Sequence, residues 1–423
     1  MNISARLIVM SFLQFGVWGA YLTSMGRYLG GIGMGDVIGW FYSMQGIVSL
    51  FMPAIMGIVA DRWVPAQRLL GLCHLLAGVA MVATGVYGMA SPHVEFSWLF
   101  TLYSLGVAFY MPTLGLSNSV AYTALDKAHK DSVKAFPPIR TFGTIGFICM
   151  MWVVDLTGFQ STPMQFVLSG VLSFLLFAYS FTLPSCPLAK HEKGKSVAES
   201  LGLKAFALFK QKRMALFFIF SMLLGASLQI TNGYANPFLE SFKSLPQYAD
   251  SFGVLHSNIL ISISQASEAL CILMIPFFLR RYGIKTVMLI AMLAWVFRFG
   301  LFGLGDPGSG VWMFVLSMLV YGVAFDFFNI SGSLFVDKET TVSLRSSAQG
   351  LFVLMTNGFG ATIGTLGAQA VVNAYIDMDS AAPQAEAWSQ VWFIFAGYAL
   401  VVAVAFALLF RYKRDGADAK AVK

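Results

Sequence analysis

Residues 311–336 read VWMFVLSMLVYGVAFDFFNISGSLFV, an apolar run long enough to cross a bilayer as one helix. The only charged side chain in this run is Asp326, which lies near its middle. A carboxylate at the centre of a membrane helix costs roughly 2.5–3.5 kcal/mol on insertion scales. Asp326 must therefore face protein or water, and its default interpretation is a substrate or proton site. The alternative is a buried acid that only pairs with a basic residue on another helix.

Runs of this kind recur along the whole chain. Of its 423 residues, 57% are hydrophobic and 11% are charged, whereas a soluble domain has roughly 25% charged residues. We expect about twelve spans, because each needs about 20 residues to cross a bilayer. Their approximate ranges are 6–29, 37–60, 66–90, 96–122, 137–156, 164–183, 213–239, 253–279, 284–304, 311–336, 345–374 and 388–411. The sequence therefore predicts an all-α polytopic membrane protein.

Basic residues in the loops predict the orientation of the chain. The longest polar stretch, residues 184–212, is rich in lysine, and excess Lys and Arg mark cytoplasmic loops. The loops expected on the opposite side contain almost no basic residues, with Lys243 as the clear exception. An even number of spans then places both termini in the cytoplasm. The net charge of +7 follows from these loops and does not indicate a nucleic-acid partner.

The central basic stretch divides the spans into two groups of six. We expect an N-terminal half over residues 1–183, a cytoplasmic linker over 184–212, a C-terminal half over 213–411 and a cytoplasmic tail over 412–423. Residues 57–63 after the second span and 276–285 after the eighth form a weak internal echo. Two six-span halves joined by a central loop are typical of major facilitator transporters.

The fifth span carries three side chains that share one helical face. Arg140, Thr144 and Phe147 are spaced four and three residues apart. Arg140 brings a permanent charge with five hydrogen-bond donors. The alternative is that Arg140, close to the start of the span, extends to the lipid headgroups.

Two further polar pairs occupy the seventh and eighth spans. Gln229 and Asn232 are three residues apart, as are Gln265 and Glu268. A single amide of this kind can simply bond one helix to another, for about 0.6 kcal/mol. Two such pairs on consecutive helices, one of them with an acid, favour a polar-lined cavity.

The tenth span adds aromatic side chains beside its acid. Tyr321 and Phe325 share a face next to Asp326, where they can pack in the core or stack on a flat ring. In the ninth span, Arg298 is interpreted first as a structural partner.

Three further residues contribute less to the prediction of a binding site. Gln14 and Trp18 form an i,i+4 pair in the first span. His74 is expected to be a structural or edge histidine, because it lies near the start of the third span.

Taken together, these side chains indicate a proton-coupled carrier of a neutral polar solute. Amides and carboxylates match hydroxyls and polar edges, and aromatics match a planar ring. One of the two buried acids could bind a proton outside and release it inside. The sequence shows no metal-ligand spacing, no cofactor motif and no nucleophile–base arrangement, which argues against an enzyme.

At these residues the chain resembles the bacterial nucleoside permeases of the nucleoside:proton symporter family, within the major facilitator superfamily. The resemblance covers essentially the whole chain. It is carried by residues 11–15 (SFLQF), 51–61 (FMPAIMGIVAD), 110–116 (YMPTLGL), 136–147 (FPPIRTFGTIGF), 228–232 (LQITN), 262–268 (SISQASE) and 321–332 (YGVAFDFFNISG). Two positions depart from the wider pattern: Ser227, where relatives can carry an acid, and Val64, where the superfamily loop motif has a glycine.

The resemblance implies uptake of purine and pyrimidine nucleosides across a bacterial inner membrane, driven by protons, without a cofactor and by a monomer. It implies that Arg140, Thr144, Gln229, Asn232, Gln265 and Glu268 bond ribose and base, and that Phe147, Tyr321 and Phe325 pack on the nucleoside. Asp326 would be the leading proton-coupling residue, with Glu268 second. The alternative is a major facilitator carrier of another neutral polar solute, such as a sugar or a narrow xanthosine-type nucleoside set.

Overall fold

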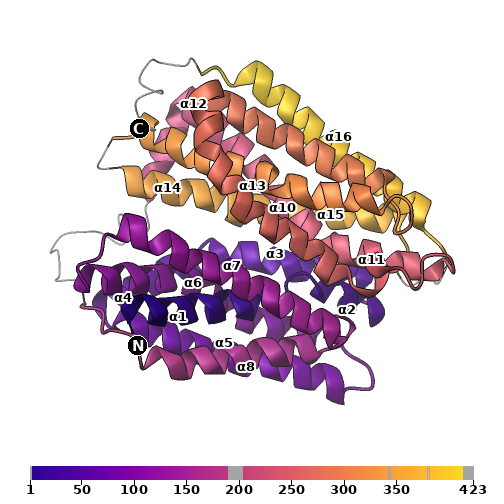
Figure 1. Ribbon diagram of the computed structural model, residues 1–423, viewed down its shortest axis with the longest axis horizontal. Coiled ribbons are helices and arrows are strands. Elements are labelled where there is room, and N and C mark those ends of the chain that lie inside the picture. The colour runs from indigo at the N-terminus through magenta and orange to yellow at the C-terminus, as the bar shows by residue number, and fades with distance from the viewer. Residues whose placement is uncertain (1, 189–202, 342–343, 379, 381, 413–423) are drawn as a thin grey trace. The chain divides into compact units, whose positions relative to one another are not determined.

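The computed structural model describes residues 2–188, 203–341, 344–378, 380 and 382–412 (Figure 1). The chain divides into two compact units, residues 1–201 and 202–423. Residues 189–202 of the predicted linker, including Lys190, Lys193 and Lys195, and residues 413–423 of the predicted tail lie outside the described part. Every regular element in the described ranges is helical.

The N-terminal unit contains the first six predicted spans. Its elements are α1 (Ile3–Gly19), α2 (Met25–Gly31), η1 (Gly35–Val37), α3 (Ile38–Ser49), α4 (Met52–Arg62), α5 (Ala66–Ala90), α6 (Phe96–Lys127), α7 (Ser132–Leu156), η2 (Phe159–Ser161) and α8 (Met164–Ser180). The predicted continuous helices over 6–29 and 37–60 are each interrupted, between α1 and α2 and between α3 and α4.

The break between α1 and α2 is bridged by a tyrosine of α3. The Tyr42 hydroxyl donates a hydrogen bond to the Leu22 carbonyl oxygen at 2.6 Å, and the Gly26 N–H donates to the Tyr42 oxygen at 3.3 Å. Backbone groups freed inside a bilayer must find such partners, because lipid offers none. The interruption is therefore a stable feature of this span.

The C-terminal unit contains the other six. Its elements are η3 (Leu203–Lys210), α10 (Lys212–Ser241), η4 (Phe242–Ser244), α11 (Phe252–Leu255), α12 (Ser257–Leu304), α13 (Val311–Glu339), α14 (Arg345–Val353), η5 (Leu354–Gly360), α15 (Ala361–Tyr375) and α16 (Ala385–Leu409). The eleventh predicted span is built from α14, a π-helical turn η5 and α15, which the hydrophobic pattern did not indicate.

The eighth and ninth predicted spans are joined directly at a sharp bend in α12. Gly283 has φ 77° and ψ 169°, a conformation that is essentially restricted to glycine. The helix on each side of Gly283 continues to it, so no loop separates the two spans. We refer below to the limbs of α12 before and after Gly283.

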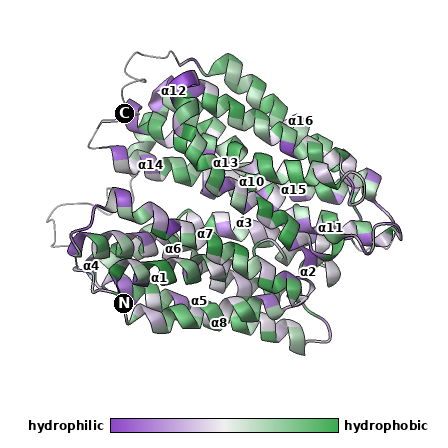
Figure 2. Cartoon of the chain, in the orientation of Figure 1, coloured by the Kyte–Doolittle hydropathy of each residue, from purple (hydrophilic) through white to green (hydrophobic). Residues whose placement is uncertain are grey.

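The helices account for the predicted twelve spans. Nine helices in the described residues are long and apolar enough to cross a membrane, and one of them, α12, covers two predicted spans. The shorter apolar helices α1 and α8 supply the remaining two. Figure 2 shows α12, α13 and α16 as mostly hydrophobic, with hydrophilic residues gathered towards helix ends and connections.

In each unit the first and fifth spans touch through glycines. A Cβ on Gly146 of α7 would lie 2.2 Å from the carbonyl oxygen of Phe12 in α1. In the C-terminal unit, a Cβ on Gly225 of α10 would lie 2.2 Å from the carbonyl oxygen of Thr356 in η5. Neither place has room for a side chain, so the two backbones are in direct contact, as small residues allow in membranes.

Candidate substrate-binding site

The ten predicted site residues are divided between the two units. Arg140, Thr144 and Phe147 lie on α7 of the N-terminal unit. The other seven lie on α10, the first limb of α12 and α13 of the C-terminal unit: Gln229, Asn232, Gln265, Glu268, Tyr321, Phe325 and Asp326.

The three residues of α7 share the helical face that was predicted, and its two ends contact α1. The Arg140 guanidinium lies 3.8 Å from the centre of the Phe15 ring. Phe147 is 6% exposed and meets Trp18 edge-on, with ring centres 6.3 Å apart. This cation–π contact holds the Arg140 guanidinium against α1. Thr144 lies half-buried between the two contacts.

A buried polar network behind this face was missed by the sequence reasoning. His74 is completely buried, which agrees with the structural alternative and excludes the edge position. Its Nε2 lies 2.8 Å from Gln14 Oε1, and Gln14 Nε2 donates to Thr113 Oγ1 at 2.7 Å. The Tyr110 hydroxyl donates to the Gln14 carbonyl oxygen at 2.8 Å. These bonds join α1, α5 and α6, and no sequence spacing connects residues so far apart.

Trp18 lies one helical turn beyond Gln14 and extends from this network to the α7 face. Its ring is 6.1 Å from the Tyr110 ring as well as close to Phe147. The buried Trp18 Nε1 makes no hydrogen bond to any described residue. It is therefore a donor without a partner among the described residues, on the side chain that contacts Phe147.

In the C-terminal unit, Tyr321 is the common neighbour of the predicted polar residues. Its ring is stacked on Phe325, with centres 5.6 Å apart and planes 5° from parallel. Gln265, Glu268 and Asp326 all lie within electrostatic range of its hydroxyl. The first limb of α12 and α13 therefore bring two acids and an amide to one aromatic side chain.

Asp326 is held inside the protein. It is 5% exposed and lies within electrostatic range of both Tyr321 and Cys271. The backbones of α12 and α13 are close here, since a Cβ on Gly322 would lie 2.6 Å from the Ser267 carbonyl oxygen. A carboxylate in this position avoids the lipid, as its charge requires.

Arg298, on the second limb of α12, is a buried cation that contacts Tyr321. It is 2% exposed, and its Nη1 donates to the Ser317 carbonyl oxygen at 2.7 Å and to Ser264 Oγ at 3.4 Å. Its guanidinium carbon lies 4.8 Å from the centre of the Tyr321 ring. These contacts connect both limbs of α12 to α13, which agrees with the structural role expected for Arg298.

Gln229 and Asn232 form a pair on one helix. Asn232 Nδ2 donates to Gln229 Oε1 at 3.2 Å, and Gln229 is 7% exposed. This bond lies within α10, so it does not join α10 to a neighbouring helix. The remaining amide atoms of the pair can therefore bind a ligand. From the sequence, this role was suggested only by the spacing of three residues.

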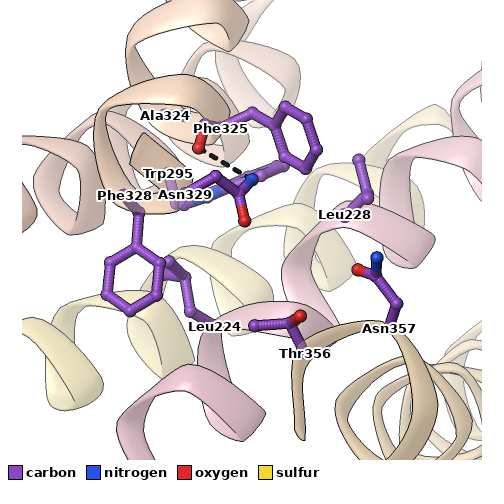
Figure 3. Close-up of a pocket in the computed structure, with 10 residues that line it drawn as sticks. Leu224, Leu228, Trp295, Ala324, Phe325, Phe328, Asn329, Thr356 and Asn357 are labelled. Atoms are coloured by element: carbon purple, nitrogen blue, oxygen red, sulfur yellow. Dashed lines mark hydrogen bonds between the residues drawn. The ribbon is translucent and has the colours of Figure 1, made fainter. Parts of the chain in front are cut away.

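A small cavity with three polar side chains in a largely apolar lining lies between α10, α12, α13 and η5, beside Phe325. It has a volume of about 20 Å³ and is lined by Leu228 of α10, Asn329 of α13, and Thr356 and Asn357 of η5, among others. Figure 3 shows the three polar side chains directed towards the same space. Asn357 was not among the predicted site residues, because only the π-helical turn reveals that it faces the cavity.

The whole chain matches one protein family. The model of the nucleoside H+ symporter family covers residues 1–415. The chain belongs to the nucleoside H+ symporter family. It is a multi-pass membrane carrier of nucleosides coupled to protons, with the major facilitator fold, and it is not an enzyme.

Two curated relatives of this symporter are about equally similar to it. Nucleoside permease NupG of Escherichia coli (strain K12) is 49% identical over 416 residues, which cover 98% of this chain and 97% of that protein. Xanthosine permease of the same organism is 48% identical over 419 residues, with the same coverage of 98% and 97%.

Solved structures agree with this family and fold. A crystal structure of nucleoside transporter NupG aligns with a TM-score of 0.88 at 49% identity, covering 98% of this chain and all of that one. A D-xylose–proton symporter aligns with a TM-score of 0.71 at 14% identity, covering 96% and 98%, which shows the fold alone.

A larger hollow in the symporter does not suit a polar solute. It has a volume of about 350 Å³ and is lined by apolar residues of α10, η5, α15 and α16 together with Tyr398. The Tyr398 hydroxyl already donates to the Leu223 carbonyl oxygen at 2.6 Å. A ligand rich in hydroxyls would leave them without partners here, at a cost in free energy.

Proposed function

We propose that this symporter takes up both purine and pyrimidine nucleosides across a bacterial inner membrane, with Asp326 as the leading proton-coupling residue and Glu268 as the second. The observation that supports this proposal is that both acids lie within electrostatic range of Tyr321, whose ring is stacked on Phe325. A nucleoside that binds near this stack would change the surroundings of both carboxyl groups. Substrate binding and proton binding would then influence each other.

The proposed substrate contacts use the chemistry of each group. Arg140, Thr144, Gln229, Asn232, Gln265 and Glu268 would hydrogen-bond ribose and base, and Phe147, Tyr321 and Phe325 would pack on the rings. The carrier would work as a monomer, with both termini in the cytoplasm, where the basic loops are expected to lie.

The coupling role is tested with Asp326→Asn in proteoliposomes. The variant keeps shape and polarity but cannot ionise, so uridine should no longer accumulate against its gradient under an imposed proton gradient. Exchange of labelled for unlabelled uridine should continue, because exchange needs no net proton movement. Asp155→Asn is the matched control: Asp155 is 4% exposed but lies at the end of α7, in the other unit. Gradient-driven accumulation by Asp326→Asn at the control level would remove Asp326 from the coupling role.

A narrower substrate range is the second candidate, supported by the 48% identity to xanthosine permease. Competition of labelled uridine uptake by adenosine, xanthosine and hexoses separates the two. Strong uridine uptake that adenosine inhibits supports the broad range. Competition by xanthosine alone, with little uridine uptake, would favour the narrow one.

A further inference from the structure

The small cavity beside Phe325 carries an inference about specificity that rests on the proposed function. Asn357 lies in the span that covers residues 347–375, where an amide is costly unless a polar group satisfies it. Asn357 is exposed and makes no hydrogen bond to any residue in the described ranges. No hydrogen bond to the described part of the protein therefore explains why this span contains an amide here.

The backbone at Asn357 is unusual and places the side chain at the cavity. Residues Leu354–Gly360 form a π-helical turn between α14 and α15. Such turns are rare and occur often at functional sites. Direct contact between Gly225 and the Thr356 carbonyl oxygen fixes this turn against α10. The part of the cavity wall that carries Asn357 thus lies directly against α10.

Three oxygen atoms face this cavity with capacity to accept hydrogen bonds. Asn329 uses its Nδ2 to donate to the Phe325 carbonyl oxygen at 3.1 Å, which leaves its Oδ1 available. The Thr356 hydroxyl donates to the carbonyl oxygens of Phe352 and Val353 at 3.1 and 3.2 Å, so its oxygen can still accept. The third is the amide oxygen of Asn357, and Figure 3 shows all three turned inwards.

The size of the cavity limits what it can hold. Its volume of about 20 Å³ exceeds the roughly 10–15 Å³ that one water needs. A hydroxyl or amino group has the size of a water, whereas a sugar or a base does not fit. We propose that Asn329, Thr356 and Asn357 form a polar subsite that accepts a hydrogen bond from one hydroxyl or amino group of the transported nucleoside.

The position of the subsite makes it selective. Phe325, a proposed ring-packing residue, is part of its lining, so a nucleoside stacked there would lie beside the opening. An analogue that lacks the matching donor would leave the facing oxygens without a partner. That loss weakens binding by about tenfold or more. The subsite would therefore distinguish nucleosides by one substituent.

The test is competition of labelled uridine uptake by 2′-deoxy, 3′-deoxy and 5′-deoxyuridine and by nucleosides with and without an amino group. The wild-type carrier should reject one analogue in this panel by about tenfold. In Asn357→Ala this discrimination should vanish, with uridine binding as weakly as the analogue does to the wild type. Asn357→Leu, which keeps the branched shape of the side chain but has no polar atom, should behave in the same way and covers the case of a poorly folded alanine variant.

Asn373→Ala is the matched control. Asn373 lies on α15 outside the cavity and accepts a hydrogen bond from Gln369 at 2.5 Å. It should retain the wild-type discrimination even if its stability falls. Equal discrimination by the wild type and both Asn357 variants would overturn the subsite. Uridine uptake by the wild type, and its competition by nucleosides, tests the proposed function separately, because a nucleoside carrier without this subsite would still show both.

Discussion

Tyr321 is the residue that connects the charged groups of the C-terminal unit. The Phe325 ring is stacked on the Tyr321 ring, with ring centres 5.6 Å apart. The guanidinium carbon of Arg298 lies 4.8 Å from the centre of the Tyr321 ring. Glu268 and Asp326 lie within electrostatic range of the Tyr321 hydroxyl. The Arg298 guanidinium therefore contacts the same ring that lies beside the two acids, and it joins this ring to the second limb of α12.

We predict that Arg298→Gln weakens both stability and nucleoside affinity. The substitution removes the cation beside Tyr321 and leaves the Ser317 carbonyl oxygen without its 2.7 Å donor. Loss of a buried charged partner costs about 1.5–3 kcal/mol. Arg298→Lys should recover only part of the effect, because an ammonium lacks the planar fork that reaches two helices. The measurements are the thermal unfolding temperature in detergent and the KM of uridine uptake.

Arg213→Gln provides the control for loss of an arginine. Arg213 pairs with Glu339 at 3.0 Å, with half of its side chain exposed, and such surface pairs contribute about 0–1 kcal/mol. This variant should resemble the wild type in both measurements. If Arg298→Gln did so too, Arg298 would have no part in holding Tyr321.

At the residue scale, the candidate site residues were predicted from two properties of the sequence. One is the free-energy cost of a charged side chain in an apolar run, and the other is the spacing of polar residues along one helix. Asp326 and Arg298 were found because charge in an apolar run needs an explanation. The His74–Gln14 bond and the exposed amide of Asn357 were missed, because both depend on the positions of several helices. Spacing along one helix predicts shared faces, but it does not show which faces meet.

At the scale of elements, the contact between α10 and the η5–α15 segment shapes the C-terminal unit. A Cβ on Gly364 would lie 2.1 Å from the Cβ of Ala226, and a Cβ on Gly360 would lie 2.3 Å from the Met222 carbonyl oxygen. The small cavity lies beside this contact. Helices that touch along glycines can also slide against each other, as alternating access requires.

We predict that Gly364→Leu destabilises the carrier. No flexible group can yield to the new side chain, so α10 and α15 must separate, at a cost of about 1–3 kcal/mol. Gly367→Leu, one turn along the same helix, is the control, since its Cβ would meet nothing within 4 Å. The control should unfold at the wild-type temperature or above it, because leucine is the better helix former. Equal melting of both variants would contradict the direct contact.

The elements were predictable in number but not in form. Hydrophobic runs located twelve spans because the bilayer sets their length. Hydropathy is insensitive to backbone conformation, so the breaks after Gly19 and Ser49, the bend at Gly283 and the π-helical turn went unnoticed. The break after Gly19 has a local partner, the Tyr42 hydroxyl at Leu22, that the apolar pattern does not contain.

At the scale of the whole molecule, both units supply groups that a nucleoside carrier needs. The N-terminal unit offers Arg140, Phe147 and the unused donor of Trp18. The C-terminal unit offers amides, an aromatic stack and both acids. The proposed separation of roles therefore confines proton coupling to the C-terminal unit and shares nucleoside binding between the two.

Proton movement driven by uridine tests the central claim most directly. Proteoliposomes that contain a trapped pH dye receive external uridine with no imposed proton gradient. For the wild-type carrier, uridine entry should acidify the interior. For Asp326→Asn, uridine should still exchange while the interior pH stays constant. Acidification by Asp326→Asn at the wild-type rate would contradict the assignment of proton coupling to this carboxylate.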